Sequence, residues 1–363
     1  MGVKSARTQT SATKKKQVAK KQLRKTSFWG RHRRLCKWLI GIFGTVLVLL
    51  VAAYIAFQIS PWPNALLIRH EFDKTGIEVS NALEKHVPAG VTAVENQQYR
   101  QDDKDGFLDV YYPEKTSTPL PVVVWVHGGA WVSGDKDEID NYLKIVASRG
   151  YTVVGVDYTI APERQYPFPI MQLNEALSYL QQNADRLRID SSKIVLAGDS
   201  AGSQIAAQMA NIIKSPSYAR EMDINPWVSP ANLKGVLLNC GAYDLALPDY
   251  NGPFGGFLHT VLWAYSGNKD FLTDPKLKSA SVLNYITKDF PPAFITAGNV
   301  DPLLAQSTEL AKRLNDLAVP ASTLFYPVGH QPELNHEYQF NLDTSDGKRA
   351  LEQMVDFLGT YNK

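Results

Sequence analysis

The segment 193–202, KIVLAGDSAG, combines residue types and a spacing that could do chemistry. Apolar residues lead into a GxSxG turn whose central residue is Ser200. A strand that turns at once into a helix strains that serine and exposes its hydroxyl, and Gly198 and Gly202 leave room for neighbouring backbone. Apolar residues at helical spacing follow over 205–213. We therefore predict a nucleophilic Ser200, with a tight structural turn as the alternative.

A nucleophilic serine needs a base to take its proton and a carboxylate to orient that base. Asp301 follows the apolar run AFITA, and His330 follows STLFYP. Both positions are at expected carboxyl ends of strands, and they give the order Ser, Asp, His. Asp244, in GAYDL, is the alternative acid, and His336, in LNHEY, is the alternative base. We favour Asp301 and His330, because His336 is further from the strand end.

Acyl transfer also needs hydrogen-bond donors for the developing oxyanion. In VVVWVHGGAWVSGD, a loop begins at His127 where the strand ends, and Gly128 and Gly129 follow. Because glycine has no side chain, the backbone N–H groups of this loop can face a reacting carbonyl. We predict Gly128, Gly129 and Ala201, the residue after the nucleophile, as the donors. We interpret His127 as a residue that braces the loop.

The elements that must position these groups alternate along the chain from residue 107. Apolar strand candidates are separated by helix-length segments, which favours a mainly parallel sheet covered by helices. The candidates are FLDVYY, PVVVWV, YTVVGVDY, KIVLA, GVLLNC, AFITA and STLFYP. Helical stripes are predicted around residues 139–146, 170–180, 310–317 and 351–358. The intervals 214–233 and 245–291 do not fit this alternation, and the second contains an apolar patch that either caps a pocket or packs in the core.

The N-terminal part differs sharply in charge from the rest of the chain. Residues 1–37 hold 13 Lys or Arg and no acidic residue, which leaves 25 basic against 36 acidic residues, a net charge of −11, afterwards. Residues 38–57 are uncharged and mostly apolar, and 20 helical residues span about 30 Å, the thickness of a bilayer core. A cleaved signal peptide usually has a shorter apolar region, so we favour an uncleaved signal anchor.

This charge asymmetry also predicts topology. Excess Lys and Arg mark the cytoplasmic flank, so residues from 60 onward are expected on the non-cytoplasmic side, at a cell surface or in an organelle lumen. The basic tail is interpreted as a topogenic segment rather than a nucleic-acid-binding one. The predicted organisation is a basic cytoplasmic tail (1–37), a transmembrane signal anchor (38–57), a connector and N-terminal cap segment of irregular or helical structure (58–104) and a catalytic domain (105–363).

Five ordered motifs together resemble a known family. They are HGGAW at 127–131, DYTIAPERQYPFP at 157–169, GDSAG at 198–202, DPL at 301–303 and the late His330. Together they resemble the hormone-sensitive-lipase-like branch of α/β-hydrolase carboxylesterases over roughly residues 105–360. The resemblance implies an eight-stranded, mostly parallel sheet, a Ser, Asp, His triad, short-acyl ester substrates and no cofactor. The sequence departs from the family pattern at two positions. Ala130 replaces the third glycine of HGGG, and Ser203 replaces the glycine after GDSAG.

These observations predict a membrane-anchored serine carboxylesterase that acts on a small-molecule ester. Ser200 attacks the carbonyl, His330 moves the proton, Asp301 orients the imidazole and backbone N–H groups hold the oxyanion. The sequence shows no metal-ligand cluster and no glycine-rich phosphate loop. The alternative from another class is a catalytically silent hydrolase fold that serves adhesion or ligand sensing. Such proteins generally lose a triad member, and candidates for all three are present here.

Overall fold

The structure, a computed structural model, describes residues 6–362, and the chain divides between Ser60 and Pro61 into two compact units. The first unit is formed by one helix, α1 (Ala6–Ile59). Its part Arg31–Ile59 has a mean hydropathy of 2.6, and none of its most apolar stretch is buried. By length and composition this helix is a candidate membrane span.

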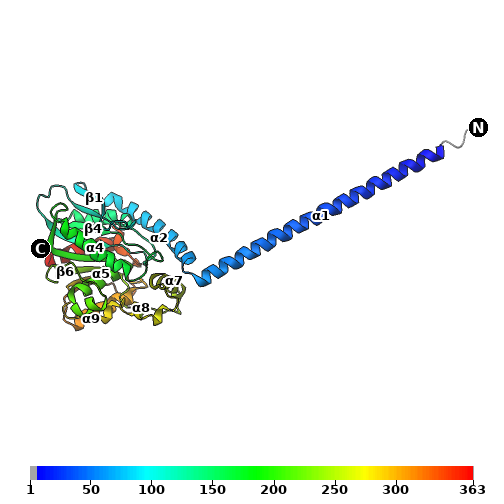
Figure 1. Cartoon of the computed structure of the whole chain (residues 1–363). Helices are drawn as coiled ribbons and strands as arrows, with labels where there is room; N and C mark the ends of the chain where they lie inside the picture. The colour runs from blue at the N-terminus through cyan, green and yellow to red at the C-terminus, as the bar shows by residue number, and fades with distance from the viewer. Residues whose placement is uncertain (1–5, 363) are drawn as a thin grey trace, which may run out of the picture. The chain divides into compact units, whose positions relative to one another are not determined.

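The second unit is built on an eight-stranded sheet (Figure 1). The strand order is β1-β2-β4-β3-β5-β6-β7-β8. The first three strands of that order pair antiparallel and all later pairs are parallel. The strands are β1 (Val91–Gln98), β2 (Phe107–Pro113), β3 (Leu120–Val126), β4 (Thr152–Val156), β5 (Ile189–Asp199), β6 (Leu233–Asn239), β7 (Ala293–Thr296) and β8 (Ala321–Leu324).

Helices cover both faces of this sheet. Alternate residues of the central strands enter two separate apolar clusters, as the period of two in a strand requires: Val122 and Val124 belong to one, Val123 and Trp125 to the other. The second unit contains α2 (Trp62–Leu83), α3 (Asp140–Ala147), α4 (Phe168–Gln182), α5 (Ser200–Lys214), α6 (Pro216–Glu221), α7 (Gly255–Ser266), α8 (Pro275–Lys278), α9 (Leu304–Asp316) and α10 (Ser345–Tyr361). Residues of α4, α5 and α9 pack in the first cluster, and residues of α3 and α10 in the second.

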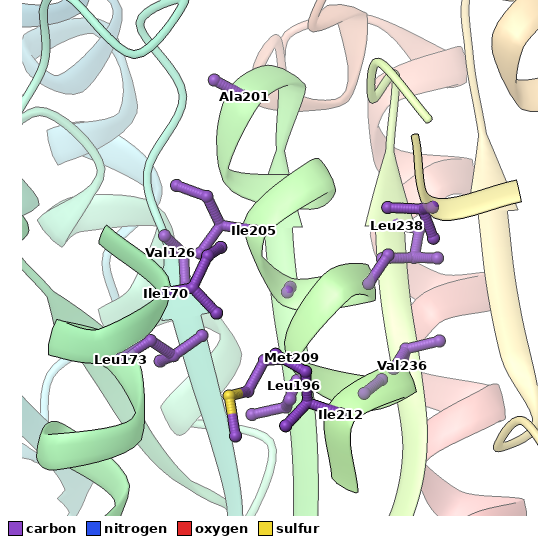
Figure 2. Close-up of a cluster of buried hydrophobic side chains, with 14 of the residues drawn as sticks. Val126, Ile170, Leu173, Leu196, Ala201, Ile205, Met209, Ile212, Val236 and Leu238 are labelled. Carbon is purple, nitrogen blue, oxygen red and sulfur yellow. The ribbon is translucent and has the colours of Figure 1, made fainter. Parts of the chain in front are cut away.

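Helix α5 is the central packing element of the first cluster. Figure 2 shows its side chains Ile205 and Met209 on the side that faces α4, which contributes Ile170 and Leu173. All four of these side chains are buried. Because β5 passes directly into α5, this packing fixes the point at which the chain turns, where Ser200 lies.

The predicted α/β-hydrolase fold with an eight-stranded, mostly parallel sheet is confirmed, and all seven strand candidates form strands. The eighth, β1, lies in the segment 58–104, where the sequence indicated only irregular or helical structure. That segment also forms α2. In the interval 245–291, Val261 and Leu262 of α7 are buried in the core, and the Phe257 ring lies 5.8 Å from that of Phe72 on α2.

Candidate active site

The turn between β5 and α5 has the backbone strain that its sequence predicted. Ser200 has a φ of 50°, in the left-handed region that non-glycine residues rarely adopt. A side chain at Gly202 would collide with the carbonyl oxygens of Val126 and His127, and one at Gly198 would collide with the backbone of Gly202. The start of α5 can therefore approach the end of β3, and the turn presents the Ser200 hydroxyl beyond the sheet edge.

Three side chains form a continuous hydrogen-bonded chain at this edge. The Ser200 Oγ lies 2.9 Å from Nε2 of His336, and Nδ1 of His336 lies 3.0 Å from both carboxylate oxygens of Asp301. An ionised carboxylate only accepts hydrogen bonds, so Nδ1–H donates to Asp301 and Nε2 is free to accept from the serine hydroxyl. Asp301, in the loop after β7, is buried and also accepts from the Leu303 N–H.

The expectation that His330 contacts Ser200 is corrected by the structure. Nε2 of His330 lies 3.2 Å from Oδ2 of Asp346, in the first turn of α10, and the His330 ring packs on Tyr326. The histidine that reaches Ser200 is His336, the alternative that the sequence left open. The alternative acid Asp244 accepts from the nearby Ala246 N–H, whereas Asp301 is the residue that contacts the histidine.

Local backbone contacts explain why His336 reaches the serine. The Leu334 N–H donates to the Asn299 side-chain oxygen at 2.8 Å, and the Val300 N–H donates to the Leu334 carbonyl at 3.2 Å. A side chain at Gly298 would collide with that carbonyl, so a glycine is needed at this crossing. The segment before His336 is thus fastened to the segment before Asp301, which aligns the two side chains.

A cavity of about 300 Å³ opens at the serine. The loop residues Gly128 and Gly129 line it beside Ser200 and His336. Ala201 is in the first turn of α5, where backbone N–H groups have no partner within the helix. The rest of the wall comes largely from α2 and from acidic residues: Phe72, Thr75, Gly76, Val79, His127, Gly134, Glu138, Ile139, Asp199, Glu337 and Phe340.

The loop that carries Gly128 is braced by a neutral histidine. Burial lowers the pKa of His127 to about 4, so its ring is uncharged at neutral pH. Its Nδ1 lies 2.9 Å from the Gly128 carbonyl, to which it donates, and its ring stacks on Tyr158 with a centroid separation of 4.3 Å. The Tyr158 hydroxyl donates to the same carbonyl at 3.1 Å. These contacts hold the carbonyl of the peptide between Gly128 and Gly129, and both glycines line the cavity.

Burial and charge shift the titration of several groups around the serine. Burial lowers the pKa of His336, but its contacts with Cys240, Asp301 and Glu337 raise it, and the net result lies well above the usual 6.5. Burial raises the pKa of the Cys240 thiol to about 11, so the sulfur is neutral at pH 7. Burial, reinforced by Asp135 and Asp73, raises the pKa of Glu138 to about 9.

Cys240, Asp301 and His336 also offer a possible set of metal ligands, with ligand atoms within 4.8 Å of one another. Two features of the described residues disfavour metal binding there. The Nδ1 of His336 already donates to Asp301, and the Cys240 thiol would have to lose a proton that its raised pKa retains. Cys240 and Cys36 are both free cysteines.

Comparison with known proteins gives a consistent result. The BD-FAE family model matches residues 108–314. The chain is 30% identical over 227 residues to an acetyl esterase of Salmonella schwarzengrund, an alignment that covers 60% of this chain and 66% of that protein. The chain thus spans just under two thirds of the length of such relatives.

Solved structures share the fold. Esterase B of Lactobacillus rhamnosis, in an inhibited form, superposes with a TM-score of 0.71 at 24% identity, covering 81% of this chain and 95% of the other. An esterase of Pyrobaculum calidifontis superposes with a TM-score of 0.66 at 24% identity, covering 84% and 95%. At these identities the superpositions establish the architecture.

Proposed function

Since this chain belongs to the BD-FAE family, within the α/β-hydrolase carboxylesterases, we propose that it hydrolyses short-acyl carboxylic esters through an acyl-enzyme. The hydrogen-bonded chain from Ser200 through His336 to Asp301 carries this proposal. Catalytically silent proteins with a hydrolase fold generally lack a member of such a triad. Here all three groups are present, and His336 lies within hydrogen-bond distance of both Ser200 and Asp301.

In the proposed mechanism, Ser200 Oγ attacks the ester carbonyl while its proton moves to Nε2 of His336. Asp301 keeps the imidazole in the required tautomer and stabilises the imidazolium that forms. The imidazolium then gives its proton to the leaving alcohol, and water repeats the sequence to release the acid. The raised pKa of His336 suits this task, because a more basic imidazole takes the serine proton more readily once it is neutral.

The tetrahedral intermediate places negative charge on the former carbonyl oxygen. Backbone N–H groups of Gly128, Gly129 and Ala201 are the proposed donors to this oxyanion. The positions of the two glycines in the cavity wall and of Ala201 at the start of α5 support this assignment. Each such donor typically contributes about 10² to 10³ in rate.

The proposed preference for short acyl groups rests on the size of the site. A cavity of about 300 Å³ is at the lower end for small-molecule pockets. Ala130 adds a methyl group where the resembling family has glycine, and it is followed by the buried Trp131, which stacks on Tyr265 with a centroid separation of 4.7 Å. The name acetyl esterase carried by relatives agrees with a small acyl group.

The test is the hydrolysis of p-nitrophenyl acetate by the detergent-solubilised chain and by its Ser200→Ala variant. We expect kcat/KM to fall by at least about 10³-fold in the variant, because the nucleophile is removed while binding contacts remain. Far-UV circular dichroism checks that both proteins are folded. Equal rates for the two proteins would exclude the serine mechanism.

We further propose that α1 anchors the enzyme in a membrane with the second unit on the non-cytoplasmic side. The apolar span Arg31–Ile59 and the cluster of Lys and Arg before it support this topology. The substrate is then an ester reached from the cell surface or an organelle lumen, and no cofactor takes part in the proposed mechanism.

A further inference from the structure

Two carboxyl side chains that the mechanism above does not use meet beside the serine. Asp199 directly precedes Ser200, and Glu337 directly follows His336. Asp199 is only 2% exposed, and its Oδ1 accepts a hydrogen bond of 2.7 Å from Nε1 of Trp125. A Cβ at Gly128 would collide with Oδ2 of Asp199 and lie 3.0 Å from Oε1 of Glu337. These two oxygens therefore border the same small gap beside Gly128.

Two carboxyl groups this close to each other share a proton at neutral pH, because both cannot be ionised without strong repulsion. Burial raises the pKa of Asp199 well above its usual range, and the charge of Glu337 and a hydrogen bond with it raise it further. The Glu337 side chain is 33% exposed, so water can solvate a charge there. Asp199 is therefore the carboxyl group of the pair that retains a proton at neutral pH.

Glu337 lies close to the site of the proton-transfer step. Its Oε1 lies 3.7 Å from Nε2 of His336, the nitrogen that accepts the Ser200 proton. Its backbone has a φ of 59°, in the left-handed region that a glutamate adopts at an energetic cost. The backbone is thus strained at Glu337, the residue whose carboxyl group lies beside the Nε2 edge of the His336 ring.

We infer that Glu337 is a positioning residue whose carboxylate stabilises the imidazolium of His336, and that Asp199 holds Glu337 in place by donating a hydrogen bond to it. This inference rests on the function proposed above. During attack, the Oγ–H bond of Ser200 breaks, the Oγ–C bond forms and the carbonyl π electrons move to oxygen. The proton remains on Nε2 of His336 until the leaving alcohol takes it, and Glu337 accepts no proton in the cycle.

The other titratable groups around the pair either face another edge of the His336 ring or are neutral at pH 7. His336 faces Asp301 through Nδ1, on the opposite edge of its ring. Cys240 is neutral because burial raises its pKa to about 11, and Glu138, in the cavity wall, is neutral at pH 7 because burial raises its pKa to about 9. No Lys or Arg is among the described residues that line the cavity.

The experiment compares pH profiles of kcat/KM for phenyl acetate, with acetate release measured by chromatography, for the full chain in detergent. In the unsubstituted protein we expect an acid limb with an apparent pKa above 6.5, because His336 must be neutral to act as a base. Glu337→Gln keeps the shape and removes the charge. We expect its acid limb to move to lower pH by about one pH unit, and kcat to fall about tenfold.

Two further variants separate this role from a structural one. Asp199→Asn replaces the protonated acid by an amide that still donates to Glu337 and accepts from Trp125, so its acid limb is expected to stay in place. Glu333→Gln removes a charge from an exposed position of the same loop and is expected to leave both the rate and the profile unchanged. The infrared difference spectrum between the unsubstituted protein and Asp199→Asn should contain the carbonyl stretch of a protonated carboxyl at neutral pH, because the subtraction removes the signal of the neutral Glu138.

An unchanged acid limb in folded Glu337→Gln would overturn the inference, as would a shift in Asp199→Asn without one in Glu337→Gln. If Glu337→Gln does not fold, the infrared comparison decides, since the absence of a protonated Asp199 also overturns the inference. These outcomes leave the proposed function intact. That function fails separately, if Ser200→Ala retains full activity on the same ester.

Discussion

At the scale of single residues, the loop after β8 provides two histidines with different surroundings. His336 contacts Ser200 and Asp301, whereas His330 contacts Asp346. We expect His336→Gln to lower kcat for p-nitrophenyl acetate by about 10³-fold or more, because no base remains to take the serine proton.

His330→Gln is the matched control, since it makes the same change six positions earlier in the chain. Its amide can still contact Asp346, so we expect kcat to stay within about threefold of the unsubstituted protein. Steady-state kinetics of both purified variants measures the contrast. A large loss in His330→Gln combined with a small loss in His336→Gln would contradict the assignment of the base.

These residues also show what the sequence could and could not predict at the site. The turn motif located Ser200, and the end of β7 located Asp301, because each is tied to the last residues of a buried strand. The histidine lies in a long loop between β8 and α10, where distance from a strand end carries little information. The choice depends on how Leu334 crosses Gly298, which is a tertiary contact that no local pattern records.

At the scale of elements, the strands that were predicted are those buried on both faces. β3 and β5 have uninterrupted apolar runs because helices cover both faces of the sheet there. The missed strand β1 lies at the sheet edge, has no fully buried residue and carries polar residues at Asn96, Gln97 and Gln98. Its pairing with β2 also shifts register between Val94 and Gln97, which interrupts the alternation that reveals a strand.

The packing of α5 makes a prediction about stability. Met209 of α5 is 0% exposed and packs in the first apolar cluster, whereas Met171 of α4 is 41% exposed. We expect Met209→Ala to lower the free energy of unfolding by about 2–5 kcal/mol, since it removes buried apolar contacts and leaves a cavity. Met171→Ala should change it by about 0.5 kcal/mol or less.

Urea unfolding of residues 61–363, which form a compact unit, measures both values of the free energy of unfolding. Because α5 begins at Ser200, the buried substitution should also lower esterase activity near its unfolding transition. Equal losses of stability in the two variants would show that the cluster of α5 is less tightly packed than its burial indicates.

At the scale of the whole molecule, charge and apolar residues are strongly segregated along the chain. The first 37 residues carry 13 basic residues and no acidic ones, and the candidate span follows directly. Among the described residues of α1, none of the most apolar stretch of the candidate span is buried, and Leu47 and Leu49 are both exposed. The proposed anchoring in a bilayer would remove this apolar surface from water.

This segregation predicts the behaviour of the full chain in cells. We expect it to remain in the membrane fraction after alkaline carbonate washing and to require detergent for release. Replacing Leu47 and Leu49 by Lys places two charges in the span, at a cost of about 2.5–3.5 kcal/mol each near the helix centre, and should shift the protein toward the soluble fraction. Leu23→Lys, in the basic tail, adds a positive charge outside the apolar span and should leave the protein in the membrane. Extraction of the unsubstituted chain by carbonate would exclude the anchor.

The proposed orientation has its own test. Protease added to intact cells should remove the second unit and spare the tail. Protection of the second unit would reverse the proposed orientation.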